Sequence, residues 1–285
     1  MAAADVVRTI VPARTRRSTR RAVRVIWRRD LIRFVDDPTR IAAWLIQPLL
    51  FLFVMGTGLQ TLSDQSTHGV KLTTFIFPGV VAMALIYSAM FSAASLVWDR
   101  ELGFLRELMI APIRRSSIIL GKCLGGATIA ASQGVVVLLL AGLVDVPYDA
   151  AMLLGMFGLE LLVAFTVTAF GVFVATTIKQ AQTFTNVMQM LVIPMIFTSG
   201  ALYPISGLPT WLGLLSRLNP LTYAVDPMRR LVFDHLDVSS GAIGTLAPGV
   251  TWWGWHVPVG VEVLMLLVMG GALIAVSVFK FTRTE

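Results

Sequence analysis

The chain of 285 residues is 56% hydrophobic and only 14% charged, which excludes a soluble globular protein of ordinary composition. Its net charge of +7 is concentrated beside long apolar runs, an arrangement typical of membrane topology signals rather than of a nucleic-acid-binding surface. The single cysteine, Cys123, excludes an intrachain disulfide and a cysteine-based metal cluster. We therefore expect an all-α integral membrane protein with no nucleic-acid partner.

The first 40 residues are rich in arginine and precede any long apolar run. Two arginine pairs, at 16–17 and 20–21, raise the question of an export signal, but the apolar run begins only at Ile41 and no small-residue cleavage site follows it. Residues 21–35 place apolar side chains on one stripe, interrupted by Asp30, and so predict an interfacial amphipathic helix. Its candidate functional residues are Arg24, Trp27, Arg28 and Leu31.

Six apolar stretches approach or exceed the roughly 20 residues that a helix needs to cross a bilayer. Gln47-Pro48 predicts a kink in the first of them, and Gly121 and Gly125 permit close helix contact at the start of the third. We expect these spans at about 41–60, 74–97, 118–143, 150–177, 183–203 and 257–280.

The segment 204–256 contains several prolines and arginines, so it cannot form one continuous span. Two short helices are expected in it, near 208–217 and 221–235, and together they predict an outer re-entrant hairpin. All lysines and arginines except Lys71, Arg217, Arg229 and Arg230 fall on one side of the expected spans, and this side is predicted to be cytoplasmic. Both termini then lie in the cytoplasm, with a tail and interfacial helix in 1–40 and a six-helix membrane domain in 41–285.

A charged, amphipathic segment at 98–122 separates the second and third spans; we call it the coupling segment. On a helical wheel Leu102, Leu105, Leu108 and Met109 share one side, and Pro112 ends this helix. From the residues alone, a partner protein docks on this helix or the helix lies on lipid headgroups.

Two motifs in the chain resemble those of a known family. Arg100-Glu101, Gly103, Glu107, Pro112 and the closing Leu-Gly-Lys resemble the cytoplasmic loop of ABC-2-type transporter permeases, in particular the daunorubicin-type multidrug export branch. Residues 218–229 resemble the short helical hairpin that precedes the last span in these permeases, although Phe104 stands where a small or hydroxyl residue is common. The resemblance covers roughly residues 20–285. It implies a coupling helix seated in a cleft of a separate ATPase subunit, with the coupling residues Glu101, Gly103, Arg106, Glu107, Pro112 and Arg114.

The chain has no visible ATP site of its own, because Gly121-Lys122 lacks the upstream glycine and the Ser/Thr of a phosphate loop. No cofactor is expected on this chain, and the resemblance places ATP and Mg²⁺ on the partner ATPase. It further implies two ATPase copies, a second permease copy forming a homodimer, and a bacterial plasma (inner) membrane. The three histidines have no metal-ligand spacing, so no metal site is expected.

Glu160 is the most deeply placed charge, about 15 Å into the fourth span at ~1.5 Å per residue. An ionisable group there costs at least ~2.5 kcal/mol, so it needs a partner or an aqueous cavity. Two interpretations remain open: Glu160 faces a dimer cavity, where it attracts a cationic substrate or carries a proton, or it makes an interhelical hydrogen bond, for example to Gln133.

The fifth span carries Gln182, Asn186 and Gln189 on one face. The resemblance implies that the second and fifth spans line the path, so this stripe contacts substrate or else holds helices together. Pro194 makes the helix bendable, and Phe197 could close the path. The candidate path residues are Glu160, Asn186, Gln189, Met188, Pro194 and Phe197.

The expected function is export of a hydrophobic drug-like compound or a lipid, powered by the separate ATPase, with no enzymatic reaction on this chain. One alternative is an ABC-2 permease for a polysaccharide or lipid-linked glycan. Two others are an intramembrane lipid-modifying enzyme and a scaffold that recruits a cytosolic partner.

Overall fold

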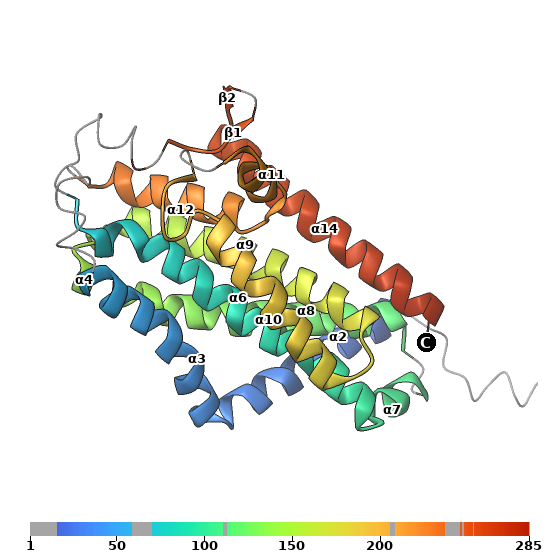
Figure 1. Ribbon diagram of the computed structural model, residues 1–285. Helices are drawn as coiled ribbons and strands as arrows, with labels where there is room; N and C mark the ends of the chain where they lie inside the picture. Colours follow the sequence, from blue (N-terminus) through green and yellow to red (C-terminus); the bar gives the residue numbers. More distant parts are fainter. Residues whose placement is uncertain are drawn as a thin grey trace, which may run out of the picture.

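The computed structural model describes residues 16–58, 70–110, 113–205, 209–236, 246, 248–252 and 254–284. The predicted all-α class is confirmed, with one short strand pair added (Figure 1). The longer helices are α2 (Arg16–Val35), α3 (Pro38–Leu50), α6 (Leu72–Glu101), α8 (Arg115–Leu138), α9 (Ala150–Thr177), α10 (Ala181–Thr198) and α14 (Val259–Thr284). The shorter elements are a π-helical turn (Phe51–Met55), α4 (Gly56–Gly58), α7 (Phe104–Ile110), a 3₁₀ turn (Ala141–Val144), α11 (Thr210–Leu218), α12 (Thr222–Asp234), β1 (Thr251–Trp252) and β2 (Trp255–His256).

Helix α6 is the centre of the bundle, because its apolar residues surround it on all sides and such a helix is stable only when it is buried. It packs against α3, α8, α9, α10 and α12. Gly79 lets the chain after α10 pass directly over it, since an added Cβ there would lie 2.3 Å from the carbonyl oxygen of Ala201. The two ends of α6 define the ends of the bundle, which we call the α12 end and the α7 end (Figure 1).

Helices α3 and α14 form the outer edges of the bundle and are exposed over most of their surface (Figure 1). Five helical segments in the described part of the chain are long and apolar enough to cross a bilayer: Ile41–Gly58, Leu72–Glu101, Arg115–Leu138, Ala150–Thr177 and Val259–Arg283. Helix α10 takes the place of the expected fifth span. It is an 18-residue helix that carries the amide side chains of Gln182, Asn186 and Gln189.

Helix α2 packs along α8 through the two glycines whose spacing predicted a close contact. An added Cβ at Gly121 would lie 2.8 Å from the Cβ of Ile26, and one at Gly125 would lie 3.3 Å from the Cβ of Asp30. The prediction is therefore confirmed, and the partner helix is α2. In the described part of the chain this helix begins at Arg16 rather than at residue 21, so it is longer than expected.

Helices α11 and α12 confirm the two short helices expected in segment 204–256, of which 206–208, 237–245, 247 and 253 lie outside the described residues. Helix α12 is buried against α6, α9 and α14. Arg229 fixes it in place: Nη2 donates a 2.6 Å hydrogen bond to the carbonyl oxygen of Gly200, and the guanidinium lies 4.1 Å from the ring centroid of Phe75. These contacts anchor α12 to α6 and to the chain that follows α10.

Candidate functional site

The coupling segment does not contain the single helix predicted for it. Helix α6 continues to Glu101 and α7 starts at Phe104, with a break at Leu102–Gly103. Gly103 has φ of 76°, which only glycine adopts without strain, and this ends α6. Leu102 is 82% exposed whereas Leu105 is buried, so the two leucines do not share a face as predicted.

The remaining predicted coupling residues lie around α7. Glu107 is exposed on α7, and Arg114 is exposed just before α8. Pro112 and the side chain of Arg106 lie outside the described residues. The role of these residues in contacting an ATPase remains a prediction.

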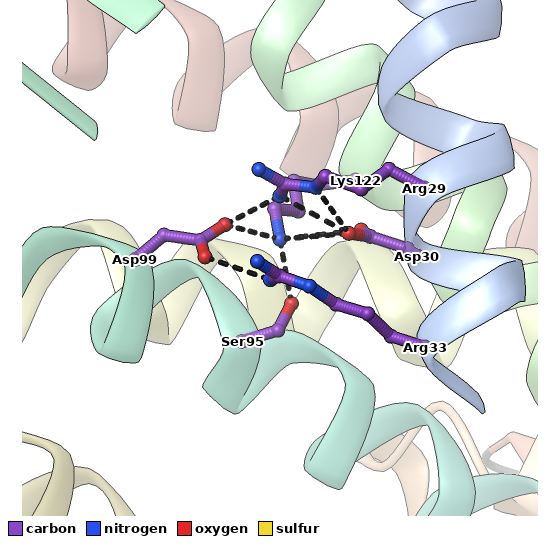
Figure 2. A network of polar contacts seen from close by, with 6 residues as sticks. All are labelled: Arg29, Asp30, Arg33, Ser95, Asp99 and Lys122. Carbon is purple, nitrogen blue, oxygen red and sulfur yellow. Dashed lines mark hydrogen bonds and ion pairs between the residues drawn. The ribbon is translucent and has the colours of Figure 1, made fainter. Parts of the chain in front are cut away.

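A buried ion cluster joins α2, α6 and α8, and its members Asp99 and Lys122 lie at the two ends of the coupling segment (Figure 2). Lys122 of α8 is its centre: Nζ lies 2.7 Å from Oδ2 of Asp99 and 3.2 Å from Oδ2 of Asp30. The same Nζ donates a 2.8 Å hydrogen bond to Oγ of Ser95. The side chains of Lys122 and Asp99 are only 1% and 3% exposed, so each charge depends on its partners for stability.

Asp99 completes the cluster by accepting bonds from two arginines of α2. Nη2 of Arg29 lies 2.6 Å from Oδ2 of Asp99, and Nη1 of Arg33 lies 3.1 Å from Oδ1 (Figure 2). One carboxylate at the end of α6 therefore binds three cations from two other helices. The Asp99 carboxylate thus connects α2, α6 and α8 at the α7 end.

Sequence reasoning missed this cluster and chose neighbouring residues of α2 instead. Arg24 and Arg28 are exposed, whereas Trp27 and Leu31 are half-buried, and Nε1 of Trp27 donates a 3.0 Å hydrogen bond to Oγ1 of Thr128. One residue does indicate the cluster in the sequence: Asp30 interrupts the apolar stripe of this helix, and its side chain is buried at 6% exposure.

Phe104 connects α7 to the same cluster. The guanidinium carbons of Arg29 and Arg33 lie 4.7 and 5.7 Å from its ring centroid, which is cation–π geometry. Phe104, which stands where a small or hydroxyl residue is common in the resembled family, therefore contacts Arg29 and Arg33 in this chain.

A cavity of about 130 Å³ lies between α3, α6 and α10. Its polar groups include Gln47, whose Nε2 donates a 2.9 Å hydrogen bond to the hydroxyl of Tyr87. Two of the predicted path residues, Met188 and Gln189, line it from α10. Most of the remaining lining is apolar, with Met90, Phe91, Phe184 and Val192.

The predicted amide stripe is present on α10. Gln182, Asn186 and Gln189 are all exposed, and Nε2 of Gln182 donates a 3.3 Å hydrogen bond to Oδ1 of Asn186. Farther along the helix, Pro194 and Phe197 are also exposed, and Pro194 lines a second hollow of about 280 Å³ near α11. Helix α10 thus carries five of the six predicted path residues.

The sixth, Glu160, lies elsewhere. It is fully buried, and an added Cβ at Gly134 would lie 3.1 Å from its carboxyl carbon, so the acid packs on the bare backbone of α8. The structure does not place it on an open cavity of this chain. The alternative interpretation, an interhelical hydrogen bond such as one to Gln133, is also not observed, because neither carboxyl oxygen has a hydrogen-bond partner among the described residues.

Comparison with known proteins agrees with this architecture. Residues 21–233 match the model of the family described as ABC-2 type transporter. A protein named as transport permease ycf38, from Pyropia yezoensis, is 31% identical over 217 residues, covering 74% of this chain and 71% of its own. Nodulation protein J of Rhizobium leguminosarum bv. trifolii is 26% identical over 74% of this chain and 80% of its own.

A protein named as multidrug ABC transporter permease YbhR, from Escherichia coli K12, is 25% identical over 160 residues, which are 55% of this chain and 43% of that protein. The family match extends over α2 from residue 21, the ion cluster, the coupling segment, α10, and the α11–α12 hairpin as far as residue 233. The chain belongs to the ABC-2 type transporter family.

Proposed function

We propose that this chain is the membrane-spanning permease subunit of an ATP-driven exporter in a bacterial plasma (inner) membrane. Two copies form the transport path, and two separate ATPase subunits bind and hydrolyse ATP with Mg²⁺. The α7 end faces the cytoplasm, because it carries the arginines of α2, the coupling segment and the last turn of α14, and cationic residues favour the cytoplasmic side.

The observation that carries this proposal is the exposed amide stripe of α10 beside a mainly apolar cavity. Amide side chains on the outside of a membrane helix need a protein or water partner, so this face borders a second copy or a hydrated path. The cavity combines methionine and phenylalanine side chains with Gln47 and Tyr87. Such a surface suits a hydrophobic drug-like molecule or a lipid, because methionine adapts its shape to different ligands.

The ATPase is expected to bind at α7. Glu107 and Arg114 are exposed there, whereas Leu105 anchors the helix to the rest of the protein. ATP-dependent movement of the partner would push on this short helix. The relative named as a multidrug ABC transporter permease supports an export role of this kind.

The test uses inverted membrane vesicles that contain the chain together with its ATPase subunit, with Hoechst 33342 and an NBD-labelled phospholipid as probes. We expect ATP-dependent movement of at least one probe, and Glu107→Ala should reduce both this movement and co-purification of the ATPase. Asp234→Ala removes an exposed carboxylate at the α12 end and is the matched control, expected to behave like the wild type. Full-rate movement without the ATPase would overturn the proposal.

A further inference from the structure

The last two residues of α6 hold both sides of the turn between α9 and α10. Nη1 of Arg100 donates hydrogen bonds to the carbonyl oxygens of Ala175, at 3.1 Å, and Ile178, at 2.9 Å. Oε1 of Glu101 accepts a 2.8 Å hydrogen bond from the backbone N–H of Ala181. The turn at 178–180 is therefore fixed by consecutive residues from a third helix.

The charges of these two residues match the helix ends that they contact. Arg100 lies at the C-terminus of α9, where backbone carbonyls carry partial negative charge, and Glu101 lies at the N-terminus of α10, where free N–H groups carry partial positive charge. The N-cap residue of α10, Gln180, makes no side-chain capping hydrogen bond. Glu101 therefore supplies the cap that α10 lacks in its own sequence.

Glu101 also lies close to α7 in the chain, so its bond to Ala181 connects α7 to α10. Glu101 directly precedes the Leu102–Gly103 break, so α7 is joined to the capping carboxylate by only two residues. Ala181 lies at the start of the helix whose Met188 and Gln189 line the cavity, about 12 Å along the axis at ~1.5 Å per residue. A displacement of α7 would therefore be transmitted, through the hydrogen bond between Glu101 and Ala181, to the helix that lines the cavity.

We propose that Glu101 is a positioning residue that transmits movement of α7 to α10, rather than a contact to the ATPase. The inference rests on the proposed function, because it assumes that a partner moves α7. In this role the Glu101 carboxylate pulls the N-terminus of α10, and α10 changes the width of the cavity beside α3 and α6. Arg100 holds the end of α9 during this movement, so that the turn moves as a unit.

The experiment distinguishes two roles of Glu101: transmitting movement from α7 to α10, or only capping the N-terminus of α10. It does so by giving α10 a capping residue in its own sequence. Three variants are compared in the complex of full-length chain and ATPase: Glu101→Ala, Gln180→Asp, and both together. An aspartate at position 180 caps α10 from within its own sequence and makes no bond to α6. Hydrogen exchange at 181–183 reports the cap, and movement of Hoechst 33342 per ATP hydrolysed reports transmission.

We expect Glu101→Ala to speed exchange at the N–H of Ala181, which loses its acceptor, and to lower transport per ATP by about fivefold or more, the range of a typical coupling energy. The double variant should show slow exchange at 182 and 183, where the new aspartate accepts hydrogen bonds, but should not regain transport. Gln180→Asp alone should transport like the wild type. The ATPase should co-purify with all three.

Recovery of transport in the double variant would overturn the proposal, because Glu101 would then only stabilise α10. Loss of ATPase binding in Glu101→Ala would also overturn it, in favour of a direct partner contact. If the wild-type chain shows no ATP-dependent transport, the proposed function fails instead, and the exchange measurement still reports whether Glu101 caps α10.

Discussion

Lys122 and Asp99 form a 2.7 Å ion pair in which both side chains are almost completely buried, and this pair connects α8 to α6 across the two ends of the coupling segment. Its geometry matters because a buried charge without its partner is far more destabilising than an exposed one. Another lysine in the chain provides the comparison: Nζ of Lys71 lies 2.6 Å from Oδ2 of Asp145, but both of those side chains are more than half exposed.

Lys122→Met is therefore expected to lower the free energy of unfolding by about 3 kcal/mol or more, because Asp30 and Asp99 lose a shared cation in a buried site. Lys71→Met makes the same chemical change in an exposed pair and should cost at most about 1 kcal/mol. Thermal unfolding of the two variants in detergent micelles measures the difference. Equal shifts in the two melting temperatures would contradict the structural role given to the cluster.

Gly121→Ala is expected to weaken the packing of α2 on α8. Its new Cβ would lie 2.8 Å from the Cβ of Ile26, and a β-branched side chain has little freedom to move away. Overpacking of this kind costs about 1–3 kcal/mol. Limited proteolysis of α2 is the measurement, with faster cleavage expected in the variant.

Gly158→Ala is the matched control, because no atom lies within 4 Å of the added Cβ. An alanine inside an unobstructed helix should stabilise it by up to about 1 kcal/mol. Faster cleavage of α2 in this variant as well would mean that the effect at Gly121 is not due to contact with Ile26.

Glu160→Met is expected to raise thermal stability. The replacement keeps the length of the side chain and removes a buried carboxyl group that has no hydrogen-bond partner among the described residues, which corresponds to a gain of about 1–3 kcal/mol. Glu160→Gln keeps an unpaired polar group and should give no such gain. A lower melting temperature for Glu160→Met would show that the acid has a stabilising partner in the assembled transporter.

Met188→Trp is expected to fill much of the 130 Å³ cavity and to reduce transport of Hoechst 33342 by an order of magnitude, while the ATPase still co-purifies. Val268→Trp places the same side chain on the exposed surface of α14 and should transport normally. Normal transport by Met188→Trp would mean that the substrate path lies outside this cavity.

Much of the helical framework follows from local patterns in the sequence. The fourth span was expected at 150–177 and α9 occupies Ala150–Thr177, because a long apolar run follows the capping residue Asp149. Helices α11 and α12 lie within a few residues of their expected positions, since prolines and the turn at Asn219-Pro220 separate them. The small residues Gly121 and Gly125 correctly indicated a close helix contact.

The contacts between helices were harder to predict, because a helical wheel does not show which helices are neighbours. Asp30, Asp99 and Lys122 are distant in the sequence. Asp99 and Lys122 each look like an ordinary surface charge near a membrane boundary, and Asp30 interrupts an apolar stripe without showing which residues it contacts. The break at Gly103 was missed because the leucines on either side continue the helical spacing, whereas the backbone of glycine at φ 76° ends it. The sequence predicts how deep Glu160 lies in its span, but not which neighbouring helix its side chain faces.

The stacking of Phe104 under Arg29 and Arg33 determines how α7 can respond to force. Gly103 breaks the helix between α6 and α7, so α7 is held by contacts such as those of Leu105 and Phe104. Because the Phe104 ring contacts the guanidinium groups of Arg29 and Arg33, the start of α7 is held against α2. A force on the other end of α7 is then transmitted to α2 and α6. Phe104→Ala would then leave every charge of the ion cluster in place and still weaken the transmission of force from α7 to α2 and α6.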